Sequence, residues 1–188
     1  NEYLYYANDV TLARATMASI VQFNNTFKTG LNSGPHPMET FLGKLYVANG
    51  NNLLEVDSTD TISSSAKLNP GLPANYVIRA LKLDQSGQKL VMIASTSDSG
   101  SLDGDCRAFM WEGQTAQYNY EVPNSDNRVT AALSSNGPLY IWGNGFYGTT
   151  MRYFNGSEFK LLRLIKGGYN PPLAGAVESL GDLSTWGA

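Results

Sequence analysis

Three carboxylates lie close together in a loop rich in glycine and serine, and they are the first residues of this sequence that could do chemistry. They are Asp98, Asp103 and Asp105, within residues 97–105. Ca²⁺ takes about six to eight oxygen ligands, so a loop of this kind could bind that ion. The spacing differs from that of an EF-hand loop, and a solvated acidic turn explains the same residues. We expect no cofactor, with calcium at this loop as the one alternative.

Two arginines precede a leucine that recurs along the chain. Arg79 lies 11 residues before Leu90, and Arg128 lies 11 residues before Leu139. We therefore expect the two guanidinium groups at equivalent positions of neighbouring repeats. Such a pair could clamp a carboxylate or a phosphate. Arginines in this setting also bridge repeats through backbone carbonyl groups, and that interpretation stays open.

Aromatic and amide side chains form a third candidate binding site. Its members are Asn144, Phe146, Tyr147 and Tyr169, all in predicted loops. Rings that stack and amides that donate hydrogen bonds suit glycan recognition, and they suit protein interfaces equally. Packing of the same rings within the fold is the alternative.

His36 is the only histidine and Cys106 the only cysteine. A single histidine without a positioned partner forms neither a zinc site nor a catalytic triad from this chain, so we expect it in an exposed turn. A single cysteine excludes an internal disulfide. We expect Cys106 to be a small buried hydrophobic residue, and we assign no catalytic residue.

The elements that must position these residues are copies of one short apolar strand. The copies begin at Leu4, Leu45, Leu90, Leu139 and Leu183, at intervals of 41, 45, 49 and 44 residues. Consecutive residues of a copy are apolar, so both faces of the strand must be covered, as in an inner layer between sheets. A period of about 40 to 50 residues made of strands and turns is typical of β-propeller blades. A β-sandwich with strands of similar length is the alternative.

The intervals predict an all-β chain that forms an arc of about four four-stranded blades, part of a larger propeller. The predicted blades are residues 1–30, which lack a first strand, then 37–68, 76–122 and 128–165, with 175–188 beginning another. The predicted strands are residues 3–7, 18–23, 26–29, 38–42, 44–48, 53–56, 62–68, 77–83, 89–95, 107–111, 117–122, 129–133, 139–142, 149–154 and 158–165. Seven of the eight prolines, Pro123 among them, then lie in connections between blades.

Loops that join second to third strands should share one face of the arc with the connections between blades. The predicted loops are residues 8–17, 49–52, 96–106 and 143–148, and they hold most of the length variation. Variable loops on a rigid scaffold usually carry binding, although tolerated insertions look the same. We expect residues 96–106 to be the most mobile or most partner-dependent segment.

The composition limits the classes of partner. Of the 188 residues, 15% are charged and the net charge is −3, which gives no basic surface for nucleic acid or an anionic membrane. Asn, Ser, Thr and Gly supply the polar surface, as is common in extracellular and virion proteins. No apolar run approaches the roughly 18 residues that span a bilayer. The sequence does not begin with Met, so we expect a processed or incomplete chain.

The segment from residue 139 resembles a blade of the kelch-like propellers. It reads Leu-Tyr-Ile-Trp-Gly-Asn-Gly, followed at residues 152–159 by Arg-Tyr-Phe-Asn-Gly-Ser-Glu-Phe. It is similar also to propeller repeats in tail and other virion proteins of tailed bacteriophages. The paired glycines typical of kelch blades are reduced here to residues 143–145 and 49–50.

This resemblance implies a non-enzymatic structural or adhesion module of a virion, such as a phage tail, or of another extracellular assembly. Its partners would be protein neighbours or glycans bound through loops on one propeller face. The alternative is a propeller-type glycoside hydrolase or lyase, with Arg79 and Arg128 as substrate clamps and acidic groups from residues 98–105. Because Leu183 begins a further copy of the repeated strand, we expect an open arc that is oligomeric or belongs to a larger chain, and not a closed four-bladed ring.

Overall fold

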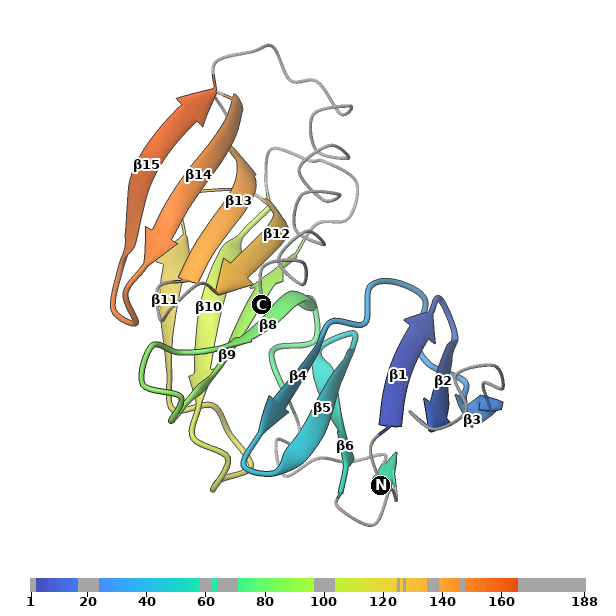
Figure 1. The fold of residues 1–188 in the computed structure, drawn as a ribbon. Coiled ribbons are helices and arrows are strands. Elements are labelled where there is room, and N and C mark those ends of the chain that lie inside the picture. Colours follow the sequence, from blue (N-terminus) through green and yellow to red (C-terminus); the bar gives the residue numbers. More distant parts are fainter. Residues whose placement is uncertain are drawn as a thin grey trace.

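The computed structural model of the chain describes residues 3–16, 24–57, 62–63, 71–96, 104–124, 126, 128–134, 139–145 and 148–165. Over these ranges the chain is all-β, with one three-stranded and three four-stranded antiparallel sheets (Figure 1). No helix long and apolar enough to cross a membrane occurs in this described part of the chain.

Each sheet is a meander of consecutive strands, and we number the sheets as blades 1 to 4 in chain order. Blade 1 contains β1 (Tyr3–Asn8), β2 (Thr11–Thr16) and β3 (Asn24–Thr29). Blade 2 contains β4 (Met38–Phe41), β5 (Lys44–Asn49), β6 (Asn52–Val56) and β7 (Ile62–Ser63). Blade 3 contains β8 (Val77–Leu83), β9 (Leu90–Ser95), β10 (Cys106–Trp111) and β11 (Tyr120–Asn124). Blade 4 contains β12 (Arg128–Ser134), β13 (Leu139–Gly145), β14 (Gly148–Phe154) and β15 (Phe159–Ile165).

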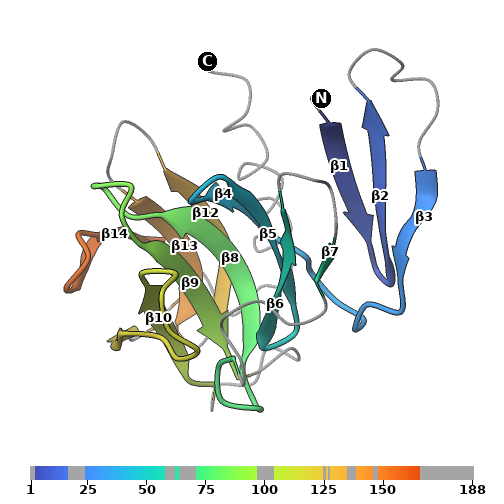
Figure 2. The same cartoon turned by 90° about the horizontal axis from the view of Figure 1, so that it is seen from below.

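The blades follow one another around an open arc, which Figures 1 and 2 show from two directions. The first strand of blade 3, β8, lies beside the first strands of blades 2 and 4, β4 and β12. First strands therefore form the inner edge of the arc, and later strands lie progressively outward. The chain is a partial β-propeller.

The repeated strand is the second strand of blades 2 to 4, namely β5, β9 and β13, and in blade 1 it is β1, which holds the second-strand position of a blade without a described first strand. Its side chains alternate between two seams. In β9, Leu90 and Met92 pack in the cluster shared with blade 2, whereas Val91 and Ile93 pack in the cluster shared with blade 4. We call the side toward the preceding blade the leading face and the side toward the following blade the trailing face. Because neighbouring residues of a strand point to opposite faces, one apolar strand serves two seams.

Three separate apolar clusters fill the three seams. The blade 1–2 seam is centred on Leu12, Val47 and Leu54. The blade 2–3 seam contains the aromatic group of Phe41, Tyr46 and Trp111, with Tyr46 and Trp111 edge to face at a centroid distance of 5.4 Å. The blade 3–4 seam contains these buried residues among others: Val91, Ile93, Cys106, Val129, Leu139, Ile141 and Phe154. The core of the molecule thus lies between sheets.

Blade 1 differs from the sequence prediction. Its middle strand is β2 at Thr11–Thr16, and not residues 18–23, which lie outside the described residues. The predicted long loop at 8–17 is a tight turn, since the Asn8 side-chain oxygen accepts hydrogen bonds from Thr11 N (3.1 Å) and Thr11 Oγ1 (2.6 Å). This side-chain acceptor closes the turn and lets pairing resume at once.

Two further boundaries are corrected. β11 occupies Tyr120–Asn124, and not residues 117–122, so Pro123 lies in this outer strand instead of a connection. An edge strand tolerates proline because its outward N–H group has no ladder partner to lose. The predicted loop at 143–148 is reduced to two residues between β13 and β14. The predicted strand extension to residue 68 and the segment 175–188 lie outside the described residues.

Candidate functional site: the loop face

The turns between second and third strands lie on the same side of the arc as the connections between blades, as the sequence predicted. Backbone hydrogen bonds join them: Leu31 N donates to Val10 O (3.1 Å), and Leu72 N donates to Asn51 O (2.9 Å). Ile78 N also donates to Gly50 O (3.0 Å). We call this surface the loop face.

His36 ties the blade 1 turn to blade 2. Its Nδ1 lies 2.7 Å from Ala48 O and its Nε2 lies 3.1 Å from Asp9 O. The expectation of an exposed turn residue is therefore wrong, because the ring is half-buried between two backbone carbonyls. Asp9 in turn accepts hydrogen bonds from Ser33 Oγ and Gly34 N, which lower the pKa of this carboxyl.

Asn51 ties the blade 2 turn to the connection that leads to blade 3. Its Nδ2 donates to Leu72 O at 2.7 Å, while its backbone oxygen accepts from Leu72 N. Gly71 has φ of +82°, and a Cβ at this position would lie 2.6 Å from Asn51 O. Beside this contact lies a shallow pocket of about 530 Å³ lined by Asn51, Gly71, Leu72, Pro73, Ala74, Gln117 and Tyr118.

A network of charged and phenolic groups follows at blade 3. Asp105 accepts hydrogen bonds from Tyr76 Oη and from Arg107 Nε (2.8 Å), and Arg107 Nη1 donates to Glu121 Oε1. Burial alone would raise the pKa of Asp105, but the hydrogen bonds from Tyr76 and Arg107 outweigh it and lower the pKa. Burial, together with the Asp105 hydrogen bond, raises the pKa of Tyr76 to about 12. Asp105 is thus already engaged by two donors, whereas Asp98 and Asp103 lie outside the described residues.

Arg79 and Arg128 lie in adjacent inner strands, yet they are not equivalent. Arg128 pairs with Asn144, and the residue of blade 3 in the same register is Val77, which pairs with Ser95. Arg79 is the residue of a β-bulge in β8, and Thr130 holds that place in β12.

The offset of two residues has a simple cause. The connection from β8 to β9 spans residues 84–89, whereas the one from β12 to β13 spans only 135–138. Counting 11 residues back from each leucine therefore reaches different places in the two ladders. Arg79 Nε lies 3.4 Å from Ser95 Oγ, a contact within its own blade. The side chain of Arg128 lies outside what the structure describes.

The aromatic and amide candidates are only partly placed. Asn144 lies in strand β13, paired with Arg128 and Thr149, and not in a loop. Its side chain, together with Phe146, Tyr147 and Tyr169, falls outside the described residues, so their grouping remains a prediction. Residues 97–103 of the acidic loop also fall outside them.

Sequence reasoning missed a buried polar cluster at the blade 3–4 seam. Asp126, whose side chain is 0% exposed, accepts from Arg152 Nε (2.7 Å) and Nη2 (2.9 Å) and from Thr150 Oγ1 (2.7 Å). Asn124 Nδ2 approaches both Asp126 (3.4 Å) and Cys106 Sγ (3.7 Å). Cys106 is buried as predicted, and burial raises the pKa of its thiol to about 12, so the thiol stays protonated and unreactive.

The described carboxylates that the sequence or the structure brings to the loop face do not have the ionisation of a general acid. Asp9 and Asp105 both have lowered pKa values, whereas a general acid needs a raised one, and Asp126 is held by Arg152 and Thr150. Glu39, on inner strand β4, does have a raised pKa because of burial, but it faces Lys82 at 4.0 Å across the blade 2–3 seam. No cluster of three metal-ligating side chains occurs within the ranges that the structure describes.

Comparison with known proteins supports the fold and nothing finer. No protein-family model and no curated protein matches the sequence. Hydrazine synthase from Kuenenia stuttgartiensis is a similar solved structure, with 12% identity, a TM-score of 0.56, and coverage of 86% of this chain and 51% of that chain. A protein of unknown function from Bacteroides caccae gives 10% identity, a TM-score of 0.49, and coverage of 87% and 57%. The chain thus spans little more than half the length of these structures, and what it shares with the first is the architecture of a β-propeller.

Proposed function

We propose that the chain is a non-enzymatic binding module whose loop face contacts protein neighbours or glycans. Its place would be a structural or adhesion component of a virion, such as a phage tail, or of another extracellular assembly. The alternative function is that of a propeller-type glycoside hydrolase or lyase, because inner-edge residues of a propeller can also line a catalytic channel.

One observation carries the proposal: the turns and connections of the loop face are fixed to one another by hydrogen bonds. His36 joins the first turn to blade 2, and Asn51 joins the second turn to the next connection. A surface fixed before binding loses little conformational entropy when a partner docks. Such loops can therefore recognise a partner without supplying reactive groups.

The exposed side chains of this surface are mostly uncharged. Val10 is 45% exposed in the blade 1 turn, and Pro35, Pro73 and Asn75 are exposed in the two connections that follow. Neutral amide and apolar groups bind glycans and protein surfaces without long-range charge attraction. The low charge of the whole sequence is in keeping with an extracellular or virion location, which we retain as part of the proposal.

Glycan-array screening followed by calorimetry tests the proposal. We expect binding of a glycan that weakens about tenfold in Asn75→Ala and in Phe146→Ala, because loop-face contacts are lost. The control is Gln85→Ala, an exposed residue in a turn at the opposite end of blade 3, which should bind as the unaltered chain does.

Two results would count against this function. Release of reducing ends or of unsaturated sugars from the bound glycan would favour the hydrolase or lyase alternative. Equal weakening by Gln85→Ala and Asn75→Ala would show that the binding surface is not the loop face. If no glycan binds, protein neighbours are the remaining partner class of the proposal.

A further inference from the structure

His36 lies between two backbone oxygens, and both of them are hydrogen-bond acceptors. Its Nδ1 is 2.7 Å from Ala48 O in β5, and its Nε2 is 3.1 Å from Asp9 O in the β1–β2 turn. Both distances fall in the range of N–H···O hydrogen bonds, about 2.7 to 3.2 Å. A carbonyl oxygen has no proton to give, and a neutral imidazole carries only one N–H group. Both contacts are therefore hydrogen bonds only when the ring is the doubly protonated imidazolium.

The neutral ring does not fit this position equally well. One of its nitrogens would present a lone pair to a carbonyl oxygen, so the repulsion of two acceptors would replace one hydrogen bond. The ring is half-buried, which limits how far water can take the place of the missing donor. Hydrogen bonds that only the charged form of a group can make favour that form. The position thus selects the imidazolium.

The carboxylate of Asp9 supplies a counter-charge beside the ring. Its Oδ1 accepts hydrogen bonds from Ser33 Oγ (2.5 Å) and Gly34 N (2.9 Å), in the same connection as His36. These hydrogen bonds, with a smaller contribution from the charge of His36, lower the pKa of Asp9, so this carboxyl group is ionised at neutral pH. Asp9 therefore binds the connection with its carboxylate and His36 with its backbone oxygen.

Apart from Asp9, no charged residue in the described ranges makes a hydrogen bond or an ion pair with His36. The strands around the blade 1–2 seam bring these charged side chains: Arg14, Lys28, Glu39, Lys44 and Glu55. Lys44 pairs with Glu55, and Glu39 faces Lys82. Arg14 lies 4.2 Å from the ring centroid of Phe27, and Lys28 is opposite Leu12 in the ladder. The protonation of His36 therefore depends on Asp9 and on the two carbonyl oxygens.

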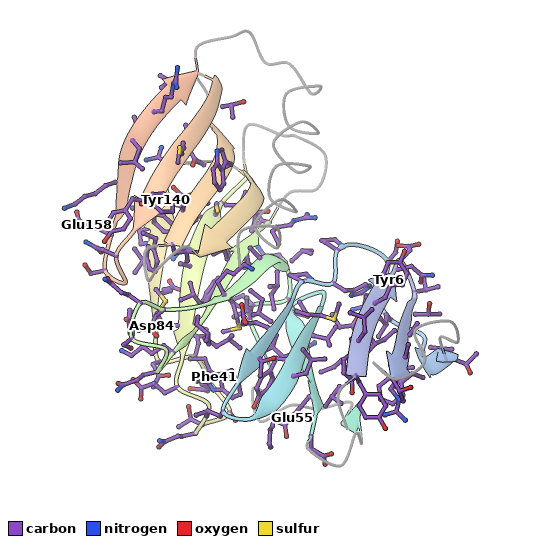
Figure 3. All side chains as sticks on the ribbon, in the orientation of Figure 1. Tyr6, Phe41, Glu55, Asp84, Tyr140 and Glu158 are labelled. Atoms are coloured by element: carbon purple, nitrogen blue, oxygen red, sulfur yellow. The ribbon has the colours of Figure 1, made fainter. Side chains whose placement is uncertain are left out.

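This arrangement holds the blade 1 turn against blade 2. The connection between the two blades, residues 30–37, also binds the turn through Leu31 N, which donates to Val10 O (3.1 Å). It binds β5 through Pro37 O, which accepts from Ala48 N (3.0 Å). The side chain of His36 contacts both the turn and β5, and so it closes the connection. Figure 3 labels Tyr6 in blade 1 and Glu55 in blade 2, the two blades that this connection joins.

We propose that Asp9, His36 and Ala48 form a pH-operated latch between blades 1 and 2. The latch is closed while the imidazolium donates to both oxygens. It opens when the ring loses a proton, because one of the two hydrogen bonds is then lost. The latch determines how the loop face is held at blade 1, and it does not depend on which partner that face binds.

The direction of the pH dependence follows from the protons bound. The closed latch keeps a second ring proton that the histidine of an unfolded chain releases near pH 6.5, its ordinary value of about 6.5 being that of model peptides. At higher pH the folded state then binds more protons than the unfolded state, so the latch weakens as the pH rises. In acid the limit is Asp9, because a carboxyl group with a lowered folded pKa loses its contribution as the pH falls through that pKa.

Nitrogen NMR of the imidazole ring tests the proposal directly. His36 is the only histidine, so a chain without a histidine tag gives a single pair of ring signals. At pH 7.5 an ordinary histidine is about one-tenth doubly protonated. We expect the ring of His36 to be mostly doubly protonated at this pH, with both N–H groups detectable. A mostly neutral ring at pH 7.5 would overturn the proposal.

Hydrogen exchange of single amides then measures the latch. We expect the protection factor of the Leu31 amide, corrected for the intrinsic rate, to fall about tenfold from pH 6.5 to pH 8.5. The Ile78 amide donates to Gly50 O at the next turn, so it is the matched control and should keep its protection factor. The side chain in His36→Gln has N–H donors but no titrating group. In that variant the protection factor of Leu31 should be independent of pH.

Asp9→Asn removes the counter-charge and leaves the backbone oxygen in place. The ring should then lose its second proton at a lower pH than in the unaltered chain, and an unchanged ring titration would contradict the role of the Asp9 charge. The latch is also contradicted if the protection factors of Leu31 and Ile78 fall equally, or if that of Leu31 falls in His36→Gln as in the unaltered chain. If His36→Gln does not fold, the ring signals of the unaltered chain still decide.

Discussion

At the scale of single residues, Asp126 shows how one buried carboxylate can secure a seam. It lies between the last strand of blade 3 and the first of blade 4, and it accepts hydrogen bonds from Thr150 and Arg152, both on β14. Its two oxygens are shared among donors from both sides, which offsets the desolvation of the charge. Removing one partner of the Asp126–Arg152 ion pair should therefore destabilise the fold more than removing both partners together.

We expect Asp126→Ala to lower the free energy of unfolding by about 3 to 5 kcal/mol, because Arg152 is left buried without its counter-charge. The double variant Asp126→Ala/Arg152→Met should be less destabilised than Asp126→Ala alone. Urea unfolding of both variants measures this difference. Glu158→Ala, which breaks an ion pair exposed at 56% on each side, serves as control and should change stability by less than about 1 kcal/mol.

Asp84 organises the β8–β9 turn and gives it a pH dependence. Burial opposes ionisation, but hydrogen bonds from Ser86 Oγ and from the backbone N–H groups of Lys89 and Gln88 lower the pKa of Asp84 below its ordinary value. A carboxyl group with a lowered folded pKa stabilises the fold above its unfolded pKa, and this contribution is lost as the pH falls through the folded pKa.

Asp84→Asn should therefore be less stable than the unaltered chain by about 1 to 2 kcal/mol at neutral pH. The difference should shrink as the pH falls below about 4, since the aspartate then becomes protonated and resembles the asparagine. Urea titrations of both proteins at several pH values give the difference directly. A difference independent of pH would mean that the charge of Asp84 contributes nothing.

The residues missed by sequence reasoning share a physical feature: their partners are distant in the chain. Asp126 meets Arg152 26 residues away, and His36 meets Asp9 27 residues away. No local pattern marks such pairs, because they depend on how one blade is set against the next. Cys106 was predictable, since a lone cysteine in an apolar strand needs no particular partner.

At the scale of elements, periodicity located most strands because both faces of a propeller strand are apolar. β4, β5, β8 and β14 agree with the prediction to within about one residue at each end, a normal uncertainty of strand ends. β2 was missed because residues 18–23, with Ile, Val and Phe, have higher strand propensity than the alanine-containing Thr11–Thr16. The signal that could have found it is the Asn8-Asp9 pair, which favours a tight turn.

Gly71 tests how closely the connections approach the turns. Gly71→Ala should lower stability by about 2 kcal/mol or more, because a Cβ would collide with the Asn51 backbone oxygen as well as strain a positive φ. Gly87→Ala is the matched control, since φ there is +70° but nothing lies within 4 Å of the added carbon. Gly87→Ala should therefore show only the cost of the backbone conformation, about 1 kcal/mol. Equal melting temperatures of the two variants would contradict the close approach.

At the scale of the whole molecule, the repeated apolar strand predicted the propeller architecture. It did not predict the register between the first and second strands of each blade. The repeated strand predicted a propeller because only radial stacking covers both of its faces without helices. The equivalence of Arg79 and Arg128 failed because the two hairpins differ in length, which residue counting from a single leucine cannot detect. Blade faces were thus predictable from sequence, whereas the positions of individual side chains along the inner edge were not.

The separation of the three seam clusters has a consequence for how the arc unfolds. The clusters share no residue, so each blade is held only by its neighbours, as in other repeat proteins. Leu12 is fully buried in the blade 1–2 seam. We expect Leu12→Ala to lower the free energy of unfolding by about 2 to 5 kcal/mol. Because blade 1 contacts the rest of the described chain through that seam, this loss should free blade 1 and leave the others folded.

Hydrogen exchange resolved by peptide should then show faster exchange of β1, β2 and β3 in Leu12→Ala, with β9 and β10 protected as in the unaltered chain. The matched variant Ile93→Ala, in the blade 3–4 seam, should instead release β12 to β15 and leave β1 to β3 unchanged. Each variant reports on one seam, so the two exchange maps should be complementary. If either variant accelerates exchange evenly in all four blades, the arc unfolds as a single unit and the seams are coupled more tightly than their separate clusters indicate.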